Sequence, residues 1–373
     1  MEYLITGGNG FIGSNLIPHL LGRDRDATVI NLDLKPNPVS EKYMDIGERR
    51  GRYTFIEGDV SDLSTYEEYL KVADIVINLA TENDKRAFDE KIERFIKTNI
   101  LGARILADAS GRTGTPMIHI STDEVYGSCP FTVHRREETS PMDPTNPYST
   151  TMASGERLVA LSRKSSGVPL AILRPCELIG PAQNINHLVP HTIKSIIEAK
   201  PPTIWGRKGE KYRDWLHIFD MCSAVETVVG SLVGDQSKTR IGEEEPEVVH
   251  PGKTVIHGTS VTTKPSVSGK DHIKLGQRII SGVTVFNVTS EMRYTLSAVV
   301  EKILGITGST LPVRENIEEE HRDLGYNPSS KKLNYHGWNP RYTDIEEILK
   351  STVEWYMDFP EYLKSELSVH LNP

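Results

Sequence analysis

The sequence lacks three features that would each point to a particular class of protein. It has only 3 cysteines in 373 residues, Cys129, Cys176 and Cys222, and their spacing fits neither a disulfide scaffold nor a metal site. No apolar run approaches the length that spans a membrane. Positive charge is not in excess, since the net charge is -8, which argues against nucleic acid as the main partner. These absences predict a reduced, cytoplasmic, globular protein without a metal, nucleic-acid or membrane partner.

What the chain does contain begins with a glycine-rich turn between a strand and a helix. An apolar strand, Glu2 to Ile5, leads into Thr6 to Gly13, which reads TGGNGFIG, and an amphipathic helix follows from Ser14 to Leu21. Glycines in this order allow a tight turn and close approach of the backbone to a pyrophosphate. A second strand, Ala27 to Leu32, ends at Asp33, about 20 residues beyond the last glycine, where a carboxylate binds ribose hydroxyls. The pattern predicts an NAD site, because Asp33 would repel the 2′-phosphate of NADP.

Polar and small residues follow the next strands of this half. Asp59 could reach the adenine of the cofactor, or it could instead cap the helix that follows it. Ala80 and Glu82 come directly after the fourth strand and are expected near the cofactor phosphates. Asn99 lies within a predicted helix from Glu93 to Ala109, where it fits a polar link to the active-site strand better than a ligand.

The stretch Ile118 to Met152 carries the residues most suited to chemistry. It begins as a buried strand, whose end is followed by Thr122, Asp123 and Glu124, and after a loop Tyr148 opens a helix. Chemistry in an open parallel sheet takes place at the carboxyl ends of the strands. Two adjacent carboxyls suit acid–base work, because neighbours push their pKa values apart. The alternative is a solvated turn at the end of the strand.

The order of strands and helices predicts an α/β fold with two parts. Residues 1–177 are expected to form a Rossmann domain, a doubly wound parallel sheet, to which segments 214–233 and 283–290 return. Residues 178–373 are expected to form mainly a smaller α/β substrate domain, because the alternation of elements becomes irregular there. The segment 234–280 is long, polar and rich in glycine and proline, and it is predicted to be an insertion of functional or disordered character.

Three motifs together resemble the extended short-chain dehydrogenase/reductase family. They are Thr6 to Gly13, Ser121 to Gly127, and Tyr148. The triplet Thr122-Asp123-Glu124 narrows the resemblance to the nucleotide-sugar 4,6-dehydratases, with the pattern of the dTDP-glucose 4,6-dehydratases. The resemblance implies a homodimer, formed through the helices at 93–109 and 148–164.

The resemblance also implies a reaction. The C4 hydroxyl of the sugar is oxidised by NAD, with Tyr148 taking the hydroxyl proton and Thr122 orienting it. Glu124 then removes the C5 proton and Asp123 protonates the departing C6 hydroxyl, so that a 4-keto-6-deoxy sugar leaves.

Further contacts follow from the resemblance and from the residues themselves. The basic run Arg207, Lys208, Lys211 and Arg213 has the right chemistry for a diphosphate, but all except Arg213 are interpreted as parts of a solvated loop. The residues expected to contact the cofactor are Gly7, Gly10, Phe11, Ile12, Gly13, Asp33, Asp59, Val60, Ala80, Asn99, Tyr148 and Met152. Those expected to contact the substrate are Glu82, Lys85, Arg86, Thr122, Glu177, Leu188, Arg213 and Arg322.

The chain departs from the family pattern where the sugar would bind. Met152 stands where the family has the Lys that lowers the pKa of the tyrosine, and Glu177 stands in place of an Asn. Either Lys85 or Arg86 compensates for Met152, or C4 oxidation is slow at neutral pH and faster in alkali, which is the outcome that we favour. Two alternatives therefore stay open: a C4 epimerase, decarboxylase or atypical dehydratase on the same scaffold, and an NAD-binding pseudoenzyme with weakened turnover.

Overall fold

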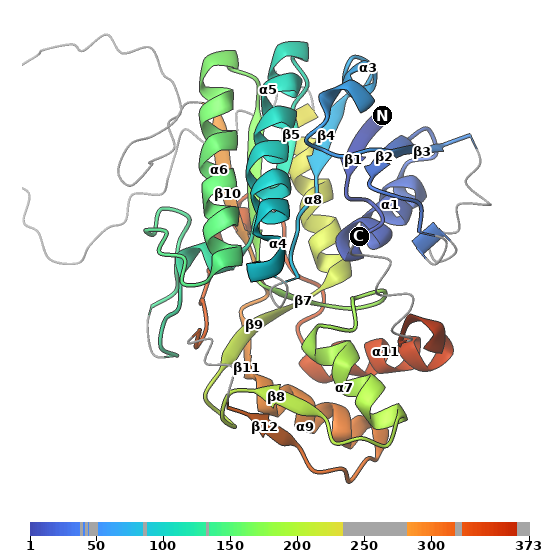
Figure 1. Ribbon diagram of the computed structural model, residues 1–373, viewed down its shortest axis with the longest axis vertical. Helices are drawn as coiled ribbons and strands as arrows, with labels where there is room; N and C mark the ends of the chain where they lie inside the picture. The colour runs from blue at the N-terminus through green and yellow to red at the C-terminus, as the bar shows by residue number, and fades with distance from the viewer. Residues whose placement is uncertain are drawn as a thin grey trace, which may run out of the picture.

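The protein consists of a large parallel sheet covered by helices on both faces and a smaller lobe at the carboxyl ends of its strands (Figure 1). The computed structural model describes residues 1–37, 40, 41, 44, 51–84, 88–131, 134–233, 282–317 and 323–363. The predicted insertion at 234–280 lies outside the described residues. No helix among the described residues combines the length and the apolar character that crossing a membrane requires.

The large sheet has seven parallel strands in the order β10-β6-β5-β4-β1-β2-β3. The strands are β1 (Glu2–Thr6), β2 (Thr28–Asp33), β3 (Tyr53–Glu57), β4 (Ile75–Asn78), β5 (Met117–Ile120), β6 (Leu170–Pro175) and β10 (Val283–Val288). The chain builds outwards from β1 to β3 and then returns to β4 on the other side of β1. The carboxyl ends of β1 and β4 therefore flank a crevice, which is where ligands bind in open α/β sheets. The doubly wound fold predicted from the sequence is confirmed.

Helices cover both faces because the central strands are apolar on both sides. Residues of α1 and α8 form one hydrophobic core with the sheet, and residues of α3, α5 and α6 form the other. The elements of this part are α1 (Phe11–Arg23), η1 (Leu63–Thr65), α3 (Glu67–Leu70), α4 (Phe88–Phe95), η3 (Ile96–Gly102), α5 (Ala103–Thr113), η4 (Asp123–Tyr126), α6 (Pro147–Ser166) and α8 (Ile218–Val233).

The helix predicted over 93–109 is interrupted by a wider turn. The segment η3 is a π-helix between α4 and α5, and α6 packs against it so closely that a Cβ at Gly155 would lie 2.0 Å from the Asn99 carbonyl oxygen. A π-helical turn changes the direction of the side chains around it. Helical periodicity alone did not reveal this turn.

The smaller lobe contains two short sheets and three helices around its own core. Its elements are β7 (Glu177–Ile179), α7 (Leu188–Ile197), β8 (Thr203–Trp205), β9 (Tyr212–His217), β11 (Met292–Thr295), α9 (Leu296–Thr307), β12 (Arg314–Asn316), α11 (Ile345–Asp358) and η5 (Pro360–Leu363). A further helix, α10 (Lys331–Tyr335), crosses back to β10.

The return segments differ in part from the prediction. α8 and β10 pack into the large part of the molecule. Residues 214–217, however, belong to β9, which pairs with β7 and β11 in the smaller lobe. The reason is that Trp215 is buried in the core of that lobe. The domain boundary at residue 177 stays a prediction.

Candidate active site

The glycine turn brings the start of α1 close to the end of β4. Gly7 has a φ of 72°, which an L side chain rarely adopts, and a Cβ there would lie 2.7 Å from the Ala80 nitrogen. At Gly13 a Cβ would lie 2.4 Å from the Gly8 Cα. Side chains at these positions would push the turn away from the sheet. The turn therefore lets the N-terminus of α1 face the crevice, where its backbone N–H groups suit a diphosphate.

Asp33 lies at the carboxyl end of β2, beside this turn. Its carboxylate accepts hydrogen bonds from the backbone nitrogens of Asn9, at 2.9 Å, and Leu34, at 2.8 Å. Burial raises the pKa of Asp33, and the two backbone hydrogen bonds act in the opposite direction. An acid that is fixed in this way can receive hydrogen bonds from two adjacent hydroxyls of a ribose and opposes a phosphate at the same place.

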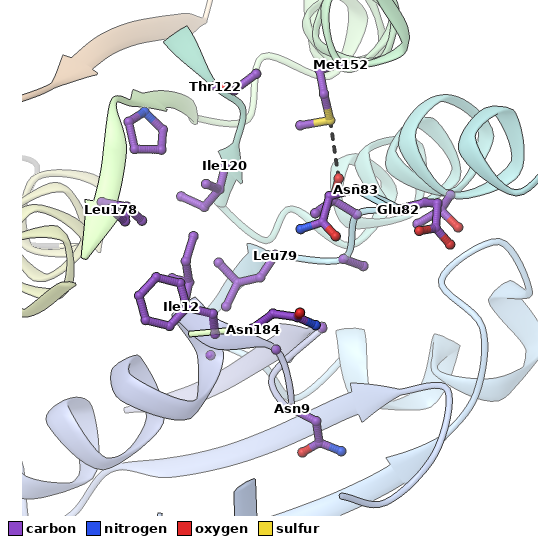
Figure 2. A pocket seen from close by; sticks show the side chains of 18 of the residues that line it. Asn9, Ile12, Leu79, Glu82, Asn83, Ile120, Thr122, Met152, Leu178 and Asn184 are labelled. Carbon is purple, nitrogen blue, oxygen red and sulfur yellow. Dashed lines mark hydrogen bonds between the residues drawn. The ribbon is translucent and has the colours of Figure 1, made fainter. Parts of the chain in front are cut away.

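A cavity of about 300 Å³ runs from the glycine turn to the end of β5. Figure 2 shows Asn9 on one side of it and Thr122 and Met152 on the other, with Ile12, Leu79, Ile120 and Leu178 between them. The cavity is lined by these predicted residues: Gly7, Gly10, Phe11, Ile12, Gly13, Asp33, Asp59, Val60, Ala80, Glu82, Thr122, Asp123, Glu124, Tyr148, Met152 and Glu177. Three of the predicted substrate residues, Lys85, Arg86 and Arg322, lie outside the described residues.

Three predicted residues are not part of the lining of this cavity. Asn99 forms a polar link: its amide accepts from the Glu82 nitrogen and donates to the Glu82 carbonyl oxygen and the Thr151 hydroxyl. Leu188 is buried in the core of the smaller lobe, where apolar α7 packs. Arg213 donates from Nη1 to the carbonyl oxygens of Tyr212 and Leu324, so this nitrogen holds the backbone together.

The cavity is also lined by residues that the sequence analysis did not predict. Gln183 and His187 come from the loop between β7 and α7, and Tyr326 comes from the segment before α10. Gln183 is held by a hydrogen bond from its Nε2 to the Leu178 carbonyl oxygen, at 2.8 Å. The Arg213 guanidinium lies 4.7 Å from the centre of the Tyr326 ring. A signal for Tyr326 was present, because Arg322 was predicted to bind substrate only four positions earlier.

The acid pair lies at the end of β5, and its two carboxyls have different surroundings. Asp123 is only 4% exposed; burial raises its pKa well above the usual value, and the neighbouring Glu124 raises it further. Glu124 is half-buried. Its backbone nitrogen donates to the Thr122 hydroxyl, at 3.3 Å, and its Oε2 accepts from the Asn146 amide, at 3.0 Å. The pair is thus suited to hold one neutral and one charged carboxyl.

Tyr148 lies in the first turn of α6, which Asn146 caps through a capping box with Ser149. Removal of the phenol from water raises its pKa far above the usual value, and the acids Glu124, Asp123 and Glu177 raise it further, whereas a hydrogen bond with Thr81 lowers it. None of these groups, in the part of the chain that the structure describes, is a cation.

Met152 lies one turn after Tyr148. Its sulfur accepts a hydrogen bond from the Thr81 hydroxyl at 3.3 Å, which is the dashed line in Figure 2. A thioether carries no charge that would offset the effect of the three acids on the phenol. The site therefore has a tyrosine at the expected place with an unusually high pKa.

Comparison with known proteins shows which family has this arrangement. Residues 3–241 match the NAD dependent epimerase/dehydratase family. The dTDP-glucose 4,6-dehydratase of Salmonella typhimurium is 34% identical over 252 residues, which are 61% of this chain and 68% of that protein. The low-salt glycan biosynthesis protein Agl12 of Haloferax volcanii is 28% identical over 365 residues, 96% of this chain and 99% of that protein.

Solved structures agree over almost the whole chain. The dTDP-glucose 4,6-dehydratase of Bacillus anthracis, in complex with NAD, has a TM-score of 0.75 and 26% identity, covering 98% of this chain and 100% of that one. The UDP-glucuronic acid 4-epimerase of Bacillus cereus, in complex with UDP-glucuronic acid and NAD, shares the fold with a TM-score of 0.75 at 21% identity, covering 96% and 100% of the two chains.

Proposed function

The chain belongs to the NAD-dependent epimerase/dehydratase family, and from this premise we propose that it is a nucleotide-sugar 4,6-dehydratase. It converts an NDP-hexose to an NDP-4-keto-6-deoxyhexose. The observation that carries the proposal is the acid pair Asp123 and Glu124, which lies at the end of β5 and lines one cavity together with Tyr148. Relatives that are named dTDP-glucose 4,6-dehydratase support it.

The glycine turn and Asp33 fit NAD. A Cβ at Gly7 would collide with the backbone at Ala80, so the turn is built for close approach, and Asp33 offers a carboxylate for the ribose. NAD bound there would supply the acceptor for a hydride from C4 of the sugar and the source of the hydride that returns to C6. The diphosphate of the cofactor would lie at the N-terminus of α1.

The residues of the acid pair divide the elimination between them. Tyr148 takes the proton of the C4 hydroxyl, with Thr122 orienting that hydroxyl, and the resulting C4 ketone makes the C5 hydrogen acidic. Glu124 takes the C5 proton, while the C6–O bond breaks and Asp123 gives its proton to the departing oxygen, so that water leaves. The raised pKa of Asp123 supports this role, because burial and the adjacent Glu124 both favour its protonated form. Glu124 then returns a proton to C5.

The charge of the cavity supports a neutral hexose over a sugar acid. Among the described residues that line it, the one Lys or Arg is Lys35, which is close in sequence to Asp33 at the cofactor end. The opposite end carries Asp123, Glu124 and Glu177. A carboxylate on the sugar would meet the like charges of Glu124 and Glu177 there, which the nearby Arg213 guanidinium offsets only in part because it acts on all three acids. This argues against an epimerase or decarboxylase that acts on a uronic acid.

Product analysis tests the proposal against the alternatives. The protein is incubated with UDP-, dTDP-, GDP- and CDP-hexoses in deuterated water, and the products are examined by mass spectrometry and NMR. A dehydratase gives a product that has lost one water and carries deuterium at C5. An isomer of unchanged mass would instead identify an epimerase. Absence of both product and reduced cofactor would identify a pseudoenzyme.

A cytoplasmic homodimer is part of the proposal. The three cysteines are buried and free, as a reducing compartment allows.

Apolar side chains of Ile92, Ile96, Leu101 and Leu161 are exposed on α4, η3 and α6, which pack against one another along one side of the large sheet (Figure 1). Apolar residues on neighbouring helices suit an interface with a second copy. We expect light scattering at micromolar concentration to give twice the mass of one chain, and Leu101→Glu with Leu161→Glu to give the mass of one. A monomeric wild type would contradict this.

A further inference from the structure

The amide of Asn146 connects three parts of the molecule. Its Oδ1 accepts from the Ser149 nitrogen, at 2.9 Å, and so caps α6. Its Nδ2 donates to Glu124 Oε2, at 3.0 Å, and to Asp323 Oδ2, at 2.9 Å. The oxygen and both hydrogens of this amide are thus used. Reversing the amide would turn its oxygen towards two carboxylates, so charge fixes its orientation.

Asp323 is itself held firmly, although it lies 177 residues further along the chain. It is 5% exposed and also accepts hydrogen bonds from the hydroxyls of Thr145 and Tyr326. Burial opposes its ionisation, but these hydrogen bonds and the one from Asn146 outweigh burial and lower the pKa of Asp323. A charged acceptor of this kind binds an amide N–H group strongly.

The segment that carries Asp323 is fixed by backbone contacts and by close packing. The Leu324 nitrogen donates to the Ser128 hydroxyl at 2.8 Å, and the Gly325 oxygen accepts from the Cys129 nitrogen at 2.8 Å. A Cβ at Gly325 would lie 2.3 Å from the ring of Tyr212, so the segment lies against that ring at a distance that only glycine permits. Asp323 is therefore a fixed point for the Asn146 amide.

We propose that Asn146, oriented by Asp323, is a positioning residue that holds the Glu124 carboxylate beside Tyr148 for removal of the C5 proton. This inference rests on the proposed function and deepens it. Tyr148 and Glu124 act in consecutive steps on neighbouring sugar atoms. Asn146 contacts the carboxylate of Glu124 and caps the helix that carries Tyr148. Thr122 holds the backbone of Glu124, whereas Asn146 holds its side chain. The bridge assigns a role to two residues that are not among those lining the cavity.

Three variants separate positioning from helix capping. Asn146→Ser keeps an oxygen for the cap but removes the amide NH2 group, whose two N–H donors reach Glu124 and Asp323. Asn146→Ala removes both the capping oxygen and the amide donors. Ser149→Ala weakens the capping box, because the Ser149 hydroxyl accepts from the Asn146 backbone nitrogen, but it keeps the Asn146 amide that donates to Glu124. The readouts are deuterium exchange at C5 of the sugar, formation of reduced cofactor, and the thermal midpoint of unfolding.

We expect C5 exchange to fall about tenfold in Asn146→Ser and Asn146→Ala, which corresponds to one hydrogen bond to a charged group. Formation of reduced cofactor should stay within about twofold, because C4 oxidation precedes the step that needs Glu124. Ser149→Ala should lower the unfolding midpoint and leave C5 exchange within about twofold. A wild-type rate of C5 exchange in Asn146→Ser would overturn the proposal. An equal loss in the rate of C5 exchange and in the rate of C4 oxidation would overturn it as well.

A double-mutant cycle tests the bridge without substrate. Asn146→Ser and Asp323→Ala are combined, and the unfolding equilibrium is measured in denaturant. We expect the two changes to be non-additive by about tenfold in the unfolding equilibrium constant, because they remove the same contact. Additive effects would overturn the bridge. Failure of the proposed function gives a different result, because the wild type then exchanges no C5 hydrogen. If the double-mutant cycle still shows non-additive effects in that case, Asn146 is a purely structural link, and its positioning role is overturned as well.

Discussion

The two halves of the cavity are built from different groups. The glycine half, residues 7–13 with Asp33, presents the backbone at the start of α1 and one carboxylate, while the N–H groups of residues 7–10 are hydrogen-bonded within the protein. The acid half, residues 122–124 with Tyr148 and Glu177, presents side chains whose charges act on one another. A backbone turn tolerates little substitution, since a Cβ collides with the sheet, whereas side chains can be exchanged singly. The sequence predicts departures from the family pattern beside this acid half, at Met152 and Glu177, so the nucleotide cofactor is easier to assign than the sugar.

The largest effect should come from removing the base of the acid half. Glu124→Gln should stall the reaction after C4 oxidation and lower the rate of product formation by about 10²–10⁴-fold, because C5 proton removal needs a base. Rapid-mixing absorbance should then show reduced cofactor that accumulates and persists. Asp123→Asn should slow loss of the C6 hydroxyl by a smaller factor. If both variants turn over like wild type, the acid pair is structural and the dehydratase assignment fails.

The contrast between the halves also describes what the sequence could reveal. Gly7 to Gly13 and Asp33 lie within one strand–helix–strand unit, so their spacing alone predicted where they come together. The acid half draws on segments that tertiary packing brings together. Gln183, His187 and Tyr326 line the cavity from the smaller lobe, and no local periodicity marks them. The π-helical turn around Asn99 is hidden for a related reason, since it lies in close contact with Gly155 on another helix.

A change in Asp33 should test the glycine half with an intermediate effect. Its carboxylate should favour NAD over NADP by about thirtyfold, since a partly buried charge that faces a 2′-phosphate costs on the order of 2 kcal/mol. Asp33→Asn should reduce this preference to a few fold and leave the backbone cradle in place. Titration of both cofactors by intrinsic fluorescence or calorimetry measures the ratio. Equal or tighter binding of NADP by the wild type would refute the assignment of Asp33 to the ribose.

The smallest effect, and the most informative about the departure from the family, should come from Met152→Lys. Burial and three acids raise the pKa of Tyr148 far above its usual value, so the reactive phenolate is scarce at neutral pH. Since each pH unit below the pKa lowers the phenolate fraction about tenfold, C4 oxidation by the wild type should rise steadily as the solution becomes alkaline. A Lys ammonium one turn from the phenol would stabilise the phenolate and lower its pKa. We therefore expect Met152→Lys to form reduced cofactor about tenfold faster at neutral pH, with its optimum at lower pH.

Met152→Leu provides the matched control for this change. It removes the sulfur that accepts from the Thr81 hydroxyl without adding charge, so its pH profile should follow that of the wild type. The measurement is the initial rate of reduced-cofactor formation against pH, with stability checked at each pH by circular dichroism.

If the wild type already has its optimum near neutrality and Lys brings no gain, then a cation compensates for Met152. Lys85→Ala and Arg86→Ala would then identify it, because both follow closely in the sequence after Thr81, which forms a hydrogen bond with Tyr148. If Lys raises the neutral rate and Leu does not, the missing charge at position 152 limits C4 oxidation, and the acid half has kept its elimination chemistry while losing part of its oxidation chemistry.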